Sequence, residues 1–226
     1  MTPILMSWSA GKDSALALDA LRAGGEFQVE GLVTTVTEDF DRISMHGVRR
    51  SLLIAQADAL GLPLIEVRIP RAASNEIYEA ALARALEPYR SRGLRHVGFG
   101  DLFLRDIRAY RERFLAGLGM AGVFPLWLRD TRALAEELVR RGFRAVAVCV
   151  DPRQLDGSFA GRWLDAAFFA DLPTGVDPCG ENGEFHTFVV DGPGFRNAVN
   201  VELGPVVLRD GFVFADLLER SAGAAA

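Results

Sequence analysis

The first residues that could do chemistry form a short polar loop near the N-terminus. An apolar run ends at Trp8, the loop reads Ser9-Ala10-Gly11-Lys12-Asp13-Ser14, and helical periodicity follows over residues 14–22. A strand that turns through a glycine into a helix presents backbone N–H groups and the positive end of the helix dipole at one point. The serine hydroxyls and the Lys12 ammonium add donors. The pattern therefore predicts a phosphate-binding loop.

Lys12 is unusual in the composition of the chain. Of the 25 basic residues one is lysine, and the other 24 (25 minus 1) are arginine. A coding bias toward arginine, as in GC-rich bacterial genomes, explains the surface positions but not this one. An ammonium is compact and rotatable, whereas a guanidinium is planar with five donors. We therefore expect the phosphate turn to require a lysine.

A second polar cluster lies in residues 180–188, which read Gly-Glu-Asn-Gly-Glu-Phe-His-Thr-Phe. Glu181, Glu184 and His186 are residue types that act as general acids and bases. Flanking glycines allow the backbone to approach a ligand closely. The density of such groups favours a site over the alternative, a solvated hairpin turn. Cys179, beside this segment, is a weaker candidate nucleophile because no base is evident near it.

The bulk composition limits the classes of function. The formal net charge is −5 and the pI is about 5.3, which disfavours a nucleic-acid partner. No apolar stretch approaches the roughly 20 residues that span a bilayer, so no membrane partner and a cytoplasmic location are expected. The cysteines show no zinc-binding spacing.

Apolar runs with strand character alternate with amphipathic segments over the first two-thirds of the chain, which predicts βαβ units on a parallel sheet. Strands are expected at 3–8, 29–36, 64–69, 96–99 and 145–150, and helices at 14–22, 50–60, 76–92, 106–118 and 131–141. Later runs at 187–190, 198–203, 206–208 and 212–214 suggest antiparallel hairpins. The predicted fold is α/β, a doubly wound parallel sheet in residues 1–128 with a smaller α+β domain in residues 129–226.

The spacing of the glycine, lysine and serine residues distinguishes two kinds of phosphate-binding loop. The mononucleotide P-loop is excluded, because Met6 stands at its first glycine position and Asp13 follows the lysine. The segment instead resembles Ser-Gly-Gly-x-Asp-Ser, the PP-loop of the ATP pyrophosphatases, with Ala10 in place of a glycine. Together with residues 180–188 it resembles the diphthine–ammonia ligase (diphthamide synthetase) family. Further matching pieces are Met45-His46, Gln56-Ala57, Gly100-Asp101, Arg108, Arg111-Glu112 and Pro125-Leu126-Trp127.

The resemblance implies a Rossmann-like PP-loop domain that uses ATP and Mg²⁺. The implied reaction joins ammonia to a small or protein-borne carboxylate through an acyl-adenylate, releasing pyrophosphate and AMP. Lys12, Glu181, Glu184 and His186 are the expected catalytic residues, and residues 9–14 the nucleotide-binding ones. Expected substrate-binding residues are His46, Asp101, Arg108, Arg111, Gly183 and Thr187. Asp13, Asp39 and Asp101 are the alternatives for a magnesium ligand.

Departures from the family pattern leave the acceptor open. Asn182 replaces a glycine and His186 stands where a glutamate is common, so diphthine, a cobalamin precursor or another acid remain alternatives. The source of ammonia and a homo-oligomeric state are also left open. Two other functions compete with the ligase: nucleophile transfer to a nucleobase, and nucleotide binding without catalysis.

Overall fold

The computed structural model describes residues 1–38, 42–43 and 47–220. The chain groups into two compact units that interleave along the sequence. Unit 1 comprises Met1–Ser9, Asp13–Ser44 and Leu62–Arg129. Unit 2 comprises Ala10–Lys12, Met45–Gly61 and Asp130–Ala226. The phosphate loop thus contributes residues to both units.

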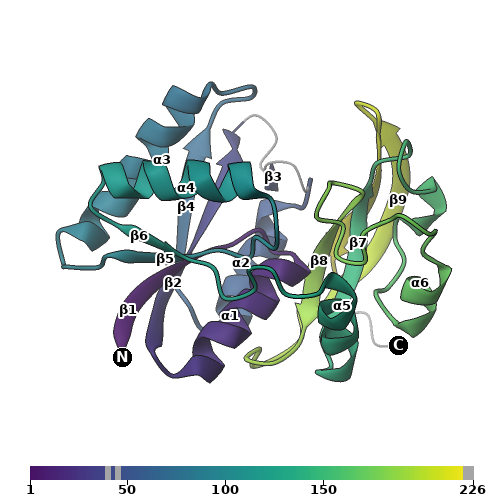
Figure 1. Cartoon of the computed structure of the whole chain (residues 1–226). Helices are drawn as coiled ribbons and strands as arrows, with labels where there is room; N and C mark the ends of the chain where they lie inside the picture. Colours follow the sequence, from purple (N-terminus) through teal and green to yellow (C-terminus); the bar gives the residue numbers. More distant parts are fainter. Residues whose placement is uncertain (39–41, 44–46, 221–226) are drawn as a thin grey trace. The chain divides into compact units, whose positions relative to one another are not determined.

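Unit 1 is built on a parallel sheet in the order β4-β2-β1-β5-β6 (Figure 1). These strands are β1 (Thr2–Ser7), β2 (Phe27–Thr37), β4 (Leu64–Ile69), β5 (His96–Gly98) and β6 (Ala121–Val123). The short β3 (Arg42–Ile43) pairs antiparallel with the end of β2. The chain first adds strands on one side of β1 and then on the other, which is the order of doubly wound sheets.

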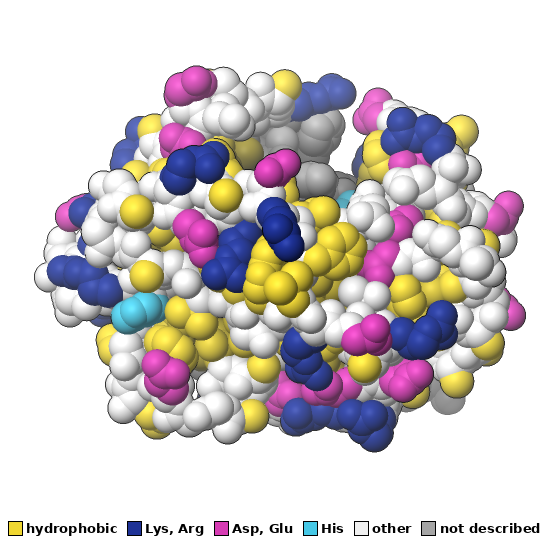
Figure 2. Space-filling model, viewed as in Figure 1, with side chains coloured by type: hydrophobic (Ala, Val, Ile, Leu, Met, Phe, Trp, Pro, Cys, Tyr) yellow, Lys and Arg dark blue, Asp and Glu magenta, His cyan; other side chains and the backbone are white. Residues whose placement is uncertain are grey.

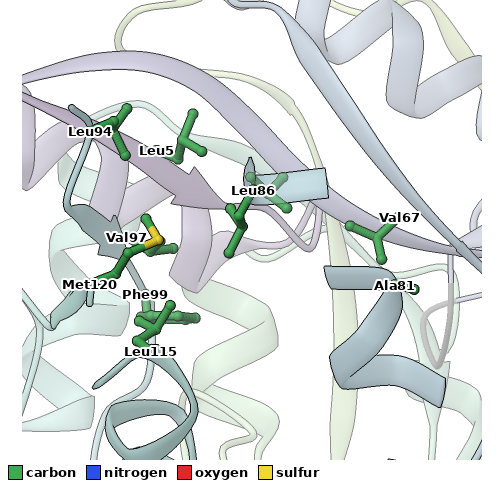
Figure 3. Packing of buried hydrophobic residues seen from close by; sticks show 10 residues of the cluster. Leu5, Val67, Ala81, Leu86, Leu94, Val97, Phe99, Leu115 and Met120 are labelled. Carbon is green, nitrogen blue, oxygen red and sulfur yellow. The ribbon is translucent and has the colours of Figure 1, made fainter. Parts of the chain in front are cut away.

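Helices cover both faces of this sheet. They are α1 (Lys12–Gly24), α3 (Asn75–Arg90) and α4 (Arg105–Gly117). Leu5 of β1 belongs to a buried cluster with Leu86 of α3 and Leu115 of α4 (Figure 3). Side chains alternate between faces along a strand, and Met6 accordingly lies with Leu21 of α1 around Gly98. The predicted doubly wound α/β fold is confirmed.

Unit 2 contains an antiparallel sheet in the order β8-β7-β10-β9. Its strands are β7 (Arg144–Val150), β8 (Phe185–Asp191), β9 (Val201–Arg209) and β10 (Phe212–Glu219). The helices of this unit are α2 (Arg50–Leu60), α5 (Thr131–Arg140), α6 (Ala166–Asp171) and the short η2 (Gly157–Phe159). The expected α+β region with an antiparallel sheet is therefore present. It is not the smaller unit, because it also takes in residues 10–12 and α2 from the N-terminal half of the chain.

The strand predicted at 145–150 is present but lies in the other sheet, and the break predicted between residues 203 and 206 is wrong. Residues 145–150, expected in the parallel sheet, form most of β7, which pairs antiparallel with both β8 and β10. This strand is buried along most of its length, and such an apolar run does not reveal which sheet it enters. The two strands expected around Pro205 are one continuous β9. Proline is tolerated there because β9 is an edge strand.

Candidate functional site

The unit 1 part of the phosphate loop lies at the end of β1. This strand ends at Ser7 and α1 begins at Lys12, with Asp13 in its first turn. The hydroxyl oxygens of Ser9 and Ser14 are 3.2 Å apart. The strand order reverses at β1, and in open α/β sheets ligands bind at the carboxyl ends of the strands beside such a reversal. The fold thus puts two hydroxyls and a helix N-terminus where an anion is expected.

Gly100, just beyond β5, packs closely against this helix start. A Cβ atom at Gly100 would lie 2.7 Å from the carbonyl carbon of Asp13 and 2.9 Å from the amide nitrogen of Ser14. A Cβ atom essentially never comes this close to a non-bonded backbone atom, so only glycine fits without a shift of the backbone. The backbone at Gly100, just after β5, therefore packs directly on the first turn of α1, with no side chain between them.

The predicted substrate-binding residues that follow Gly100 are paired in unit 1. The Arg111 Nε atom lies 2.9 Å from Asp101 Oδ2, and its guanidinium stacks 4.6 Å from the Phe99 ring centre. Arg108 donates to Glu112 at 2.8 Å, and it also stacks on aromatic rings. Both arginines are thus paired with carboxylates, and their substrate-binding role stays a prediction. On the face drawn in Figure 2, basic side chains are scattered among acidic and apolar ones.

The unit 2 part of the loop, residues 10–12, is attached to β8 and α2. Ala10 has a left-handed φ of +66°, a conformation that costs a non-glycine residue about 1–2 kcal/mol. Its carbonyl accepts hydrogen bonds from the Val189 N–H at 2.9 Å and from Gln56 Nε2 at 3.0 Å. The same Gln56 nitrogen donates to the Val189 carbonyl at 2.5 Å. The fully buried Gln56 amide therefore ties the loop to β8.

Lys12 is buried in unit 2, with only 3% of its surface exposed. Its backbone N–H donates to the Thr187 hydroxyl at 3.0 Å, and its Nζ atom donates to the Cys179 carbonyl. The ammonium also lies 5.4 Å from the centre of the Phe185 ring. The structure thus joins the catalytic lysine predicted from the loop to residues of the 180–188 segment and its neighbour.

Glu184 organises the turn that precedes β8. Its buried carboxylate accepts from the Asp177 N–H, from the Asn182 N–H and from the Asn182 side-chain amide, each at 3.0 Å. Gly183, between Asn182 and Glu184, has a φ of +87°, a backbone conformation that favours glycine. The Glu181 N–H donates to an oxygen of Asp177 at 2.9 Å. These contacts give Glu184 a clear part in shaping the turn; its predicted catalytic role stays a prediction.

His186 lies in β8 close to Lys12. Burial, and secondarily the positive charge of Lys12, lower the pKa of His186 to about 4. The imidazole is therefore neutral at pH 7 and can accept a proton or a hydrogen bond. The imidazole close to the predicted lysine is thus a neutral base rather than a second cation.

The two cysteines are buried. Burial, together with the charge of Asp151, raises the pKa of Cys149 to about 12, so this thiol stays protonated and unreactive. The Cys179 thiol donates to the Thr131 carbonyl at 3.3 Å. Cys179 contributes its backbone carbonyl to Lys12, a role that its side-chain type could not indicate.

Some predicted residues lie outside the described part of the chain, namely His46 and Asp39. Among the described residues, no group of three or more His, Cys, Asp and Glu side chains is placed to hold a metal ion. A magnesium ligand therefore stays a prediction. The described helices also include none long and apolar enough to cross a bilayer.

Gln56 is the main residue of the site whose role the sequence did not predict. Its match to the family pattern predicts no role for it, and its hydrogen-bond partners are 46 and 133 positions away in the sequence. A glutamine among the apolar residues of an otherwise buried helix face is the one available signal, because a buried amide needs partners.

Comparisons with known proteins cover most of the chain. The diphthamide synthase N-terminal domain matches residues 1–121, and the diphthamide synthase C-terminal domain matches residues 130–212. The diphthine–ammonia ligase of Homo sapiens is 32% identical over 118 residues, which are 50% of this chain and 44% of the human protein. The Danio rerio protein of the same name is 30% identical over 121 residues, 50% of this chain and 46% of that protein. The matched segment is thus less than half of each relative. Because the N-terminal domain alone matches more than half of the chain, the chain belongs to the diphthamide synthase family.

Proposed function

We propose that this chain is an ATP-dependent ligase that converts a carboxylate and ammonia into an amide. A carboxylate oxygen attacks the α-phosphorus of ATP and pyrophosphate leaves. Ammonia then attacks the activated acyl carbon, and AMP leaves with the oxygen that came from the carboxylate. The acid, ammonia and ATP are thus converted into the amide, AMP and pyrophosphate, with the oxygen lost from the acid retained in AMP.

The single observation that carries this proposal is the close backbone packing around the start of α1, beside β1, where the strand order of the unit 1 sheet reverses. Gly100 leaves room for no side chain against the first turn of α1, and Ser9 and Ser14 bring their hydroxyls together there. A helix N-terminus with hydroxyl donors suits a phosphate chain. The family membership adds that relatives of this chain carry the name diphthine–ammonia ligase.

Lys12 is proposed to stabilise the charge that grows on pyrophosphate as it leaves. An ammonium has three donor hydrogens, so the Cys179 carbonyl and a phosphate oxygen can both be its partners. The carbonyl contact and the ring of Phe185 fix the direction of the side chain before substrate arrives. Such preorganised donors act most strongly where water is excluded, as it is around this buried residue. Mg²⁺ is expected to accompany ATP.

For the second step, we assign the ammonia to the 180–188 segment. His186 is neutral because of its lowered pKa, so it can take up the proton that the attacking ammonia must lose. Glu181 offers a carboxylate that can attract ammonium. The hydrogen bonds of Glu184 support a positioning role for that residue, which holds the turn carrying Glu181 and Asn182.

The test is an end-product assay with ATP, magnesium, ammonium and a panel of acids that includes diphthine and carboxylate precursors of cobalamin. The proposal expects AMP and pyrophosphate in equal amounts, dependent on both the acid and ammonium. Formation of ADP and phosphate would contradict it. If AMP were released at the same rate without ammonium, the result would support formation of the acyl-adenylate but contradict the proposed amidation.

A further inference from the structure

The strand β9 is an open edge of the unit 2 sheet. In the order β8-β7-β10-β9 it pairs with β10 alone, within the part of the chain that the structure describes (Figure 1). An open edge presents backbone N–H and C=O groups that can pair with another strand. The side chains along this edge should therefore be complementary to those of a partner strand.

Four large apolar side chains of this edge strand are exposed, and three of them, all but Val207, lie on one face. Leu203, Val206 and Leu208 are 51, 55 and 72% exposed. They pair across to Leu217, Ala215 and Val213 of β10. Because those partners are spaced by two residues, these three side chains lie on the same face of the sheet. An exposed apolar stripe along an unpaired edge is uncommon in a monomer, where edges are usually protected by charge.

The charged residues of β9 indicate which strand would pair with this edge. The strand reads Val-Glu-Leu-Gly-Pro-Val-Val-Leu-Arg, with Glu202 near its start and Arg209 at its end. If a second β9 runs antiparallel in the register that places Leu203 opposite Leu208, then Glu202 of each copy faces Arg209 of the other. The strand is therefore complementary to its own reverse in both charge and apolar character, as a two-fold interface requires.

Pro205 lies next to the two-fold axis of such a pair. Gly204 and Pro205 together lie opposite the single residue Asp216, which forms a β-bulge. The bulge and the missing N–H of proline interrupt the edge at its centre. Pairing is thus confined to the stretches on either side, 201–203 and 206–209, which hold the apolar and charged residues.

We propose that β9 pairs antiparallel with β9 of a second copy of this chain, forming a two-fold dimer through a sheet that continues across both copies. Leu203 packs against Leu208 of the second copy, and Glu202 pairs with its Arg209. This interface goes beyond the ligase reaction and does not depend on it.

The test uses reversal of each charge, measured by light scattering coupled to size-exclusion chromatography and by analytical ultracentrifugation. The parent protein is expected to be a dimer. Glu202→Arg alone and Arg209→Glu alone each place like charges opposite each other twice, and should raise the dimer dissociation constant about tenfold or more. An equal mixture of the two variants restores both opposite-charge pairs and should dimerise like the parent.

Two controls keep the result interpretable. Arg209 also stacks on Phe214 at 4.6 Å, so melting temperatures of all variants are compared; Val206→Glu provides a second route to a monomer that leaves Arg209 in place. Ile77→Glu, at an exposed position on α3, should leave the dimer unchanged. A monomeric parent, single variants that dimerise normally, or a mixture that stays monomeric would each overturn the proposal.

Discussion

The two parts of the phosphate loop are held by different physical means. In unit 1, the helix start at Asp13 and Ser14 is fixed by the absence of a side chain at Gly100, which lets backbone meet backbone. In unit 2, residues 10–12 are fixed by donated hydrogen bonds, from the Gln56 amide and the Val189 N–H to the Ala10 carbonyl. Steric fit positions one part of the loop, and directed hydrogen bonds position the other.

This difference has a consequence for how each part responds to mutation. A steric contact fails when a single carbon is added, because a close-packed backbone cannot make room. A hydrogen-bonded contact fails when donors are removed, since the buried carbonyls are then left with fewer partners. Substitutions at Gly100 should therefore test the steric contact in unit 1, and substitutions at Gln56 should test the hydrogen bonds that anchor residues 10–12 in unit 2.

The largest effect is expected at Lys12, which belongs to the hydrogen-bonded part. Lys12→Arg and Lys12→Met should each lower the rate of pyrophosphate release about 10²–10³-fold, as removal of one preorganised donor does. The arginine retains the charge but cannot reproduce a compact ammonium in a buried position. If Lys12→Arg kept nearly the activity of the parent protein, the loop would not require a lysine, and the single lysine would have no functional explanation.

Gly100→Ala tests the steric part. The added carbon should destabilise the protein by about 1–3 kcal/mol through overpacking and raise the KM for ATP, because the helix start must shift. Gly117→Ala is the matched control, since a Cβ at Gly117 has no atom within 4 Å. Equal behaviour of the two variants in thermal melts and ATP titrations would contradict the steric account.

Gln56→Met tests anchoring, with a side chain of similar length and no donor. Loss of the bonds to the Ala10 and Val189 carbonyls should lower the free energy of unfolding by about 1–3 kcal/mol. Gln56→Glu should be worse at neutral pH, since it places carboxylate oxygens against the same carbonyls. Denaturant titrations of the three proteins give the ranking, and equal stability of all three would refute the anchoring role.

The smallest effect concerns pH and His186. Its pKa falls from the usual 6.5 to about 4 on folding, so the unfolded chain binds the proton more tightly. The contribution to stability is complete above pH 6.5 and is lost as the pH falls toward 4. Between about pH 7 and about pH 5.5 the loss should be about 1 kcal/mol. Nuclear magnetic resonance titration of the imidazole checks the pKa, and His186→Asn should flatten this part of the stability profile.

Much of the fold could be predicted from the sequence because its signals are local. Residues 50–60 and 64–69 were predicted with the bounds that α2 and β4 have, since helical periodicity and glycine stops are short-range. The three-residue β6 was missed. The sheet that receives β7 could not be predicted, because a strand buried on both faces carries no directional pattern.

The site divides in the same way. The loop was recognised because a strand, a glycine turn and a helix start are adjacent in sequence. The anchoring of Ala10 by Gln56 and Val189 was not foreseen, since it joins residues separated by 46 and more than 100 positions. Sequence alone gives the chemistry of such residues but not the partners that tertiary structure brings to them.

The most direct test of the proposed reaction follows an isotope from the acid. The acid that supports AMP formation is labelled with ¹⁸O in its carboxylate, and the products of one incubation with ATP and ammonium are separated for mass spectrometry. Attack of the carboxylate on the α-phosphorus predicts one ¹⁸O atom in AMP for each amide formed. Label in inorganic phosphate, or unlabelled AMP, would contradict the account.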